Sequence, residues 1–134
     1  MKHIRTDKAP APIGPYNQAV LADGKLYISG QIAIDPASGE LHPAAHGTDV
    51  AAETQVVMDN MAAVLDAVGM SFANLVKCSI FLKDMDDFGA VNEVYGRCFA
   101  EGKAPARETV QVSRLPKDVR VEISGIAFGR APDY

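Results

Sequence analysis

The chain has 134 residues and a formal net charge of −4, and its sequence pI is about 5.3. The length predicts a single domain, residues 1–134, which can bury a core without disulfide or metal support. The acidic balance disfavours nucleic-acid binding, because phosphate contacts require clustered surplus lysine and arginine. No apolar run approaches the ~20 residues that span a membrane, and the charged N-terminus lacks the apolar segment of a signal peptide. We therefore expect a cytoplasmic protein.

The N-terminal part of the chain predicts a stiff loop followed by a β-hairpin. Three prolines between residues 10 and 15 exclude helix and central strand, so an extended loop or tether is expected. Residues 17–21 predict a short strand, and residues 26–29 predict the strand that returns beside it. The dipeptide Asp23-Gly24 between them is typical of a two-residue hairpin turn.

Two amphipathic helices are predicted in the middle of the chain. Residues 49–68 place apolar side chains mostly at three- and four-residue steps, and Thr48 or Asp49 can cap the first turn. Residues 88–99 carry a second apolar stripe with the same spacing. Each helix must bury this stripe against another element, and a sheet can cover both.

Three further strands are predicted, at residues 75–82, 109–112 and 119–127, the last with clear alternation. The element order is then β-β-α-β-α-β-β, which predicts an α+β fold with a mixed sheet and two helices on one face. Several strands are apolar on both sides, so the opposite face also requires cover, and self-association would supply it. The tail, residues 130–134, is expected to be loose.

No metal site or nucleophilic catalyst stands out. Cys78 and Cys98 lie in apolar segments without a C-x-x-C motif, which favours buried free thiols over a disulfide. His42 and His46 have the i, i+4 spacing of two ligands on a helix, but the proline and glycine around them favour a solvated loop. There is also no Gly-x-Ser-x-Gly motif and no phosphate-binding glycine loop.

Arg107 is the first candidate for a functional side chain. It follows Ala104-Pro105-Ala106 at the start of a short strand, which would hold the guanidinium in a fixed direction. A guanidinium offers a planar pair of donors that suits a carboxylate. The alternative is a surface arginine that pairs with Glu108 or Asp118.

Other polar candidates lie at strand ends and on one helix. Glu122, on the more polar side of the last strand, either activates a water molecule or faces solvent. Tyr16 follows the proline-rich loop and either packs beneath it or presents its hydroxyl. Ser29 and Gly30 end a strand where a backbone can approach a ligand or form a turn. Asn92 in the second helix is expected to bond neighbouring backbone.

Several short motifs stand in order along the chain: PIGPYNQA (12–19), SGQ (29–31), Asn60, FGAVN (88–92), PARETV (105–110), LP (115–116) and VEI (121–123). In this order and spacing, the chain resembles the RidA (YjgF) family of reactive-intermediate deaminases. The resemblance implies a chorismate-mutase-like α+β domain that forms a homotrimer with sites between subunits. It implies hydrolysis of enamines and imines such as 2-aminoacrylate and 2-iminobutanoate to 2-keto acids and ammonia. It implies no cofactor and no metal.

The resemblance also implies roles for individual residues. Arg107 matches the arginine that binds the substrate carboxylate, Glu122 the glutamate that positions the attacking water, and Tyr16 the tyrosine that closes the pocket. The remaining substrate-binding positions implied by the resemblance are Thr109, near the substrate nitrogen, Ser29 and Gly30 in the pocket wall, and Asn92 as its support. Such a site needs no nucleophilic side chain, because a protonated imine is already electrophilic.

Two features depart from the family pattern and leave other functions open. Glu108 stands where relatives carry a small hydroxyl residue and could pair with Arg107, which would weaken anion binding. The loop at residues 40–49 is longer than in compact members and could tune access to the pocket. The alternatives are a dedicated catabolic deaminase, such as one acting on 2-aminomuconate, and a non-enzymatic trimer that binds a small carboxylate. An endoribonuclease is disfavoured by the acidic charge.

Overall fold

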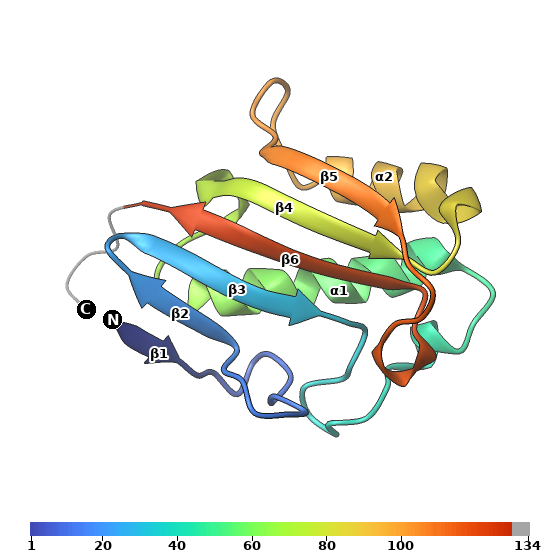
Figure 1. Cartoon of the computed structure of the whole chain (residues 1–134), viewed down its shortest axis with the longest axis horizontal. Coiled ribbons are helices and arrows are strands. Elements are labelled where there is room, and N and C mark those ends of the chain that lie inside the picture. Colours follow the sequence, from blue (N-terminus) through green and yellow to red (C-terminus); the bar gives the residue numbers. More distant parts are fainter. Residues whose placement is uncertain (130–134) are drawn as a thin grey trace.

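Within residues 1–129, which the computed structural model describes, six strands form one mixed sheet and two helices cover one of its faces (Figure 1). The elements are β1 (Lys2–Ile4), β2 (Ala19–Ala22), β3 (Lys25–Gln31), α1 (Val50–Asp66), β4 (Leu75–Leu82), α2 (Phe88–Gly96), β5 (Ala106–Gln111) and β6 (Val121–Phe128). The strand order is β1-β2-β3-β6-β4-β5, with β4 and β5 parallel and the other neighbours antiparallel. The predicted α+β fold is thus confirmed, and the predicted loose tail lies outside the described residues.

The sequence missed one strand and misplaced several ends. β1 pairs with β2, but its three residues are too few to show a pattern of their own. β5 begins at Ala106 rather than at Thr109, because its first residues pair with β4 from Lys77 onward. α2 ends at Gly96, three residues before the predicted end at residue 99. These differences concern the pairing of strands and the exact ends of elements. Neither is set by the apolar spacing within a segment, and helix ends are uncertain by one or two residues in any case.

The local signals that the sequence did show are confirmed. Asp49 caps α1, since its side chain accepts a bond of 2.9 Å from the amide of Ala51. Asp23 and Gly24 both adopt positive φ angles, 56° and 77°, as a type I′ hairpin turn requires. The side chains that α1 buries against the sheet include Val57, Met58, Met61, Val64 and Leu65. Burial of each such side chain stabilises the fold by ~1.5–3 kcal/mol.

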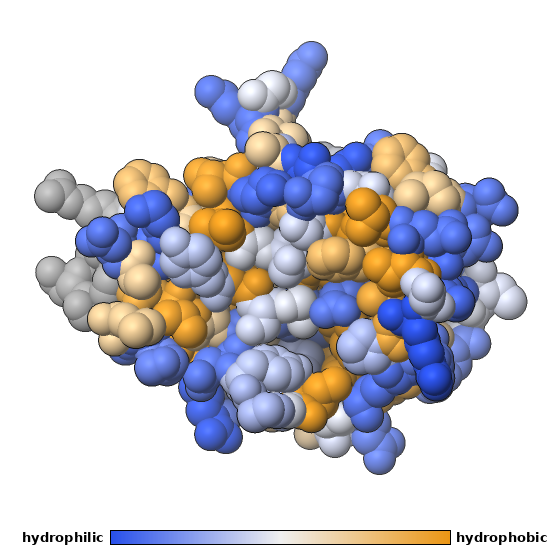
Figure 2. All heavy atoms as spheres, in the orientation of Figure 1, coloured by the Kyte–Doolittle hydropathy of each residue, from blue (hydrophilic) through white to orange (hydrophobic). Residues whose placement is uncertain are grey.

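The sheet face opposite the helices is open in the single chain. Along β6, Val121 and Ile123 are buried under the helices, whereas Glu122 and Ser124 point to the open face. Tyr27 and other large side chains remain exposed there. Figure 2 shows this face as a mixture of hydrophobic and hydrophilic residues around a paler centre. Self-association through it stays a prediction.

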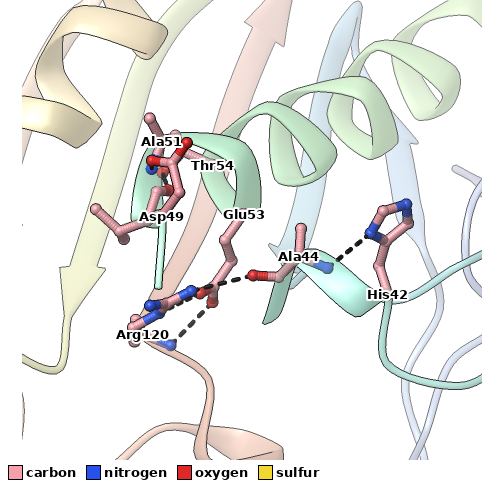
Figure 3. Close-up of polar contacts among 8 residues, drawn as sticks. His42, Ala44, Asp49, Ala51, Glu53, Thr54 and Arg120 are labelled. Carbon is pink, nitrogen blue, oxygen red and sulfur yellow. Dashed lines mark hydrogen bonds and ion pairs between the residues drawn. The ribbon is translucent and has the colours of Figure 1, made fainter. Parts of the chain in front are cut away.

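A buried ion pair joins α1 to the segment that leads into β6 (Figure 3). Glu53 is fully buried, and its carboxylate accepts bonds from the side chain of Arg120 at 2.6 Å and from the Arg120 amide at 2.9 Å. The same guanidinium donates to the carbonyl of Ala44 at 3.0 Å. The loop at residues 40–49 is therefore fastened to the residue two positions before Glu122.

Candidate functional site

A small pocket lies between the N-terminal loop and the adjoining ends of β3 and β6, and it contains Tyr16, Gly30 and Glu122. Its wall is otherwise mostly apolar, formed by Pro10, Ile13, Ile32, Pro116 and neighbouring residues. The cavity measures about 40 Å³ in the single chain. One water needs roughly 10–15 Å³ by this kind of measure, so the cavity has room for two or three waters. We call Tyr16, Gly30 and Glu122 the Glu122 pocket.

The Glu122 side chain occupies space in this pocket that is free only because residue 30 is a glycine. A β-carbon at position 30 would stand 2.8 Å from Glu122 Cδ and closer still to Oε2, so no larger residue fits without displacing the carboxyl group. The pairing of β3 with β6 is irregular between Ile28 and Gln31, so Gly30 lies in a bulge of β3 opposite this part of β6. Burial raises the pKa of the Glu122 carboxyl group above its ordinary value.

Tyr16 and Ser29 are fixed by contacts with the N-terminal loop. The Tyr16 hydroxyl accepts a bond of 3.2 Å from the amide of Ile13, and the side chain is 45% exposed. The Ser29 hydroxyl donates to the carbonyl of Asn17 at 2.6 Å. In this chain Ser29 thus holds the segment that follows Tyr16, while Gly30 lines the pocket.

Gln18 is a residue that the sequence analysis did not single out. Its side chain is buried, accepts from the amide of Thr6 at 2.7 Å and donates to the carbonyls of Thr6 at 2.9 Å, Ala9 at 3.2 Å and Pro10 at 2.9 Å. These bonds hold the proline-rich loop against β2, and Pro10 is part of the pocket wall. The available signal was a glutamine at the start of an apolar strand.

A second group of candidates gathers where α2 packs beside β5. The guanidinium of Arg107 donates to Asn92 Oδ1 at 2.7 Å and lies over the rings of Phe88 and Tyr95, 5.6 Å and 5.1 Å from their centroids. Asn92 therefore bonds a side chain rather than the backbone group that was expected. Thr109 lies two residues further along β5, and its hydroxyl is buried without a hydrogen-bond partner in the described part of the chain. We call these five residues the Arg107 cluster.

The alternative for Arg107, a surface pairing with Glu108 or Asp118, is not found within residues 1–129. Glu108 bonds Lys77 at 2.8 Å and Ser79 instead, on the open face of the sheet. Asp118 pairs with Arg114 at 2.6 Å. The contact with Lys77 is the main cause of the lowered pKa of Glu108, followed by the bond from Ser79. Arg107 thus keeps a positive charge that no described carboxylate neutralises.

The Glu122 pocket and the Arg107 cluster lie on opposite faces of the sheet. Arg107 contacts α2 on the helix-covered face, whereas Glu122 points to the open face. On β4, which lies between β5 and β6, Arg107 pairs with Cys78 and Glu122 pairs with Phe81, three residues further along. Two strand spacings separate β5 from β6. These offsets put the two α-carbons ~14 Å apart. A single chain therefore does not bring Arg107 to Glu122.

The histidines lie apart from both groups, whereas Cys78 borders the Arg107 cluster, because it pairs with Arg107 between β4 and β5 and its thiol faces the Tyr95 hydroxyl. Cys78 is buried and free, as predicted, whereas Cys98 is free but only partly buried. His42 accepts a bond of 3.0 Å from the amide of Ala44 through Nδ1 and caps a short turn (Figure 3). Among residues 1–129, no three His, Cys, Asp or Glu side chains lie together where they could hold a metal ion. The described helices include none that is long and apolar enough to cross a membrane.

Comparison with known proteins gives the chain its family. The family model described as Endoribonuclease L-PSP matches residues 6–128. A RutC family protein of Synechocystis is 50% identical over 127 residues, which cover 95% of each chain. A 2-iminobutanoate/2-iminopropanoate deaminase of Rattus norvegicus is 48% identical over 126 residues, which cover 94% of this chain and 88% of the relative.

Solved structures agree with these matches. The YjgF gene product of E. coli has a TM-score of 0.86 and 43% identity, with 97% of this chain and all of that chain covered (100%). E. coli TdcF, solved with bound serine, has a TM-score of 0.86 and 39% identity over 97% of this chain and 100% of that chain. The chain therefore belongs to the Endoribonuclease L-PSP family, the family of the RidA and YjgF proteins.

Proposed function

We propose that this protein is a hydrolytic deaminase that converts enamines and imines of the 2-aminoacrylate and 2-iminobutanoate type to 2-keto acids and ammonia in the cytoplasm. The observation that carries the proposal is the state of Arg107, a cation held by Asn92 without a described carboxylate partner. Such a group suits the carboxylate that all these substrates share. The deaminase names of mammalian relatives at 48–49% identity support the same activity.

The proposed active unit is a homotrimer, with each site shared between two subunits. Arg107 and Glu122 cannot meet in one chain, because they point to opposite faces of the sheet. β5 is an edge strand, so the Arg107 cluster lies at the border of the sheet. The Arg107 cluster of one subunit would then face the Glu122 pocket of the next. The buried hydroxyl of Thr109, which has no partner in the described chain, would take a bond near the substrate nitrogen.

The proposed reaction starts from the imine, which forms from the enamine by protonation at carbon. Water adds to the imine carbon, its oxygen forms the new C–O bond, and the imine π electrons move to nitrogen. The tetrahedral intermediate then expels ammonia and becomes the 2-keto acid. Glu122 would accept one proton from the attacking water and pass it to nitrogen. It would then accept the hydroxyl proton of the intermediate as the carbonyl forms and pass that proton to the nitrogen as the C–N bond breaks, so both protons of water leave with ammonia. A carboxyl group with a raised pKa suits both steps, because it can hold or release a proton closer to neutral pH.

The dimensions of the Glu122 pocket agree with this role. A cavity of about 40 Å³ holds two or three waters, including the attacking one, but not a substrate of several heavy atoms, so the substrate body would lie between the pocket and Arg107. Tyr16, which is partly exposed at the pocket, would close it over the substrate. This reaction calls for neither a cofactor nor a metal, because the substrate itself supplies the electrophile.

The experiment that tests this proposal generates 2-aminoacrylate from serine with a pyridoxal-phosphate-dependent dehydratase. The wild-type protein should accelerate the loss of the imine, and Arg107→Ala should abolish the acceleration. Arg114→Ala is the matched control, since Arg114 is a surface arginine that pairs with Asp118. Light scattering should report a trimer for all three proteins. A folded trimer without acceleration would contradict the proposal for this substrate.

A bulkier imine and a purely binding role are the two alternatives. A catabolic deaminase would act on a substrate such as 2-aminomuconate and release ammonia from it. A non-enzymatic carboxylate binder would be stabilised by small carboxylates without turnover. The binding role is supported in the sequence by Glu108, which could pair with Arg107. In the structure Glu108 instead bonds Lys77 and Ser79 on the opposite face of the sheet. Deamination is therefore the function that we favour.

A further inference from the structure

Three side chains of α2 are directed at the guanidinium of Arg107. Phe88, Asn92 and Tyr95 stand at positions i, i+4 and i+7, so they share one face of the helix. Asn92 bonds Nη1 at 2.7 Å, while the Phe88 and Tyr95 rings lie 5.6 Å and 5.1 Å from the guanidinium carbon. Both distances lie within the ~6 Å range of a cation–π contact.

Packing accounts for the Tyr95 ring in part, because that ring lies in the core with its centroid 4.9 Å from the centroid of Phe99. It accounts less well for Phe88. Phe88 is 38% exposed, so its ring gains less from burial than a core side chain does. Tyr95 is buried, yet its hydroxyl has no hydrogen-bond partner that meets ordinary geometry among the described residues. What the two side chains share is an aromatic ring beside the same cation.

We propose that Phe88 and Tyr95 are positioning residues that hold the Arg107 guanidinium in one orientation for the substrate carboxylate. This inference deepens the proposed function and rests on it. An arginine side chain has many rotamers, and freezing them weakens binding unless the free protein has already done so. Asn92 occupies Nη1, and the two rings restrict the plane of the group. The Nε and Nη2 donors remain to form the two parallel bonds that a carboxylate accepts.

The proposal predicts that the two rings matter for substrate binding although neither carries a charge. Phe88→Leu removes one ring at a partly exposed position, so the variant should fold. We expect KM for 2-aminoacrylate to rise about fivefold, the equivalent of a cation–π contact of ~1 kcal/mol, with kcat changed less than about twofold. Phe128→Leu is the matched control, because Phe128 holds a similar contact with Lys25, at 5.9 Å, away from the Arg107 cluster.

A second measurement follows the guanidinium itself, without substrate. The ¹⁵N order parameter of the Arg107 Nε–Hε group should be high in the wild-type protein and fall in Phe88→Leu and Tyr95→Leu. It should stay high in Tyr95→Phe, which keeps the ring and loses only the hydroxyl, and in Phe128→Leu. Order parameters that remain unchanged in Phe88→Leu would overturn the proposal, as would a lower order parameter with an unchanged KM.

The two measurements also separate this inference from the proposed function. A wild-type protein that does not accelerate imine loss would contradict the deaminase proposal. The order parameters would still decide whether the rings fix Arg107, since they require no turnover. In that case titration with 2-oxobutanoate, a small keto carboxylate, replaces KM as the measure of carboxylate affinity. An equal affinity for wild type and Phe88→Leu would overturn the positioning role.

Discussion

Gly30 and Glu122 occupy space on neighbouring strands that only a glycine leaves open. A β-carbon at position 30 would stand 2.8 Å from Glu122 Cδ, which is closer than real β-carbons approach, and 3.0 Å from Cγ, which is a tight contact. The Glu122 carboxyl group can therefore lie beside β3 only because position 30 has no side chain. The geometry of the pocket thus depends on a residue that carries no functional group.

Gly30→Ala should accordingly displace Glu122 and lower the deaminase rate. The added methyl group should change the stability of the fold little, because every atom that it crowds belongs to the flexible Glu122 side chain, which can turn aside. Gly96→Ala is the control, because a β-carbon there meets no atom within 4 Å; alanine in the helix should keep or raise stability, by up to ~1 kcal/mol. Urea unfolding and imine-loss rates test both variants, and a fully active Gly30→Ala protein would contradict this account of Glu122.

The raised pKa of Glu122 predicts a pH dependence of stability. Burial favours the neutral carboxyl group, so between the ordinary value of 4.5 and the native pKa the folded chain binds more protons than the unfolded chain. The free energy of unfolding contributed by Glu122 therefore falls as pH rises through this interval. Glu122→Gln removes the titration.

The measurement is the stability difference between Glu122→Gln and wild type at several pH values. The difference should shift in favour of the glutamine variant above about pH 4.5 and level off once the native carboxyl group is ionised. A difference that stays constant from pH 4 to pH 8, or that moves in favour of the wild type, would contradict burial as the cause of the shift.

Removing one partner of the ion pair between Glu53 and Arg120 should cost far more stability than breaking a surface pair. Arg120→Met leaves the fully buried Glu53 carboxylate without its cation, which should cost ~3–5 kcal/mol. Glu93→Gln breaks the exposed pair with Arg97 and should change stability by about 0.5 kcal/mol or less. Chemical denaturation of both variants gives the comparison, and equal effects would show that burial does not distinguish the two pairs.

The bonds from Gln18 should keep the N-terminal loop closed. Gln18→Met removes the acceptor of the Thr6 amide and the donor to the carbonyls of Thr6, Ala9 and Pro10. Hydrogen exchange at the Thr6 amide should accelerate at least about fivefold, since a lost buried bond costs ~1–3 kcal/mol. The Cys78 amide on the central strand β4 is an internal reference and should exchange at its original rate. Unchanged exchange at Thr6 would show that other contacts hold the loop.

The sequence by itself determined the elements whose signals are local. The apolar spacing of α1, its cap at Asp49, the full extent of β4 and the Asp23-Gly24 turn were all predictable, because each depends on residues within a few positions of one another. The candidate residues Arg107, Glu122 and Tyr16 also came from short motifs, and their roles stay predictions. Glu53 lies at the spacing of the apolar positions of α1, so its burial could be predicted from the sequence. Its partner, Arg120, could not.

Only the tertiary structure decided which of these residues meet. Glu53 and Arg120 are 67 positions apart, and Asn92 and Arg107 are 15 apart. β1 exists only because β2 pairs with it. The separation of Arg107 from Glu122 follows from strand order and register, since a shift of one residue moves a side chain to the other face of a sheet. Periodicity within a segment does not contain that information, because register is set between segments distant in sequence.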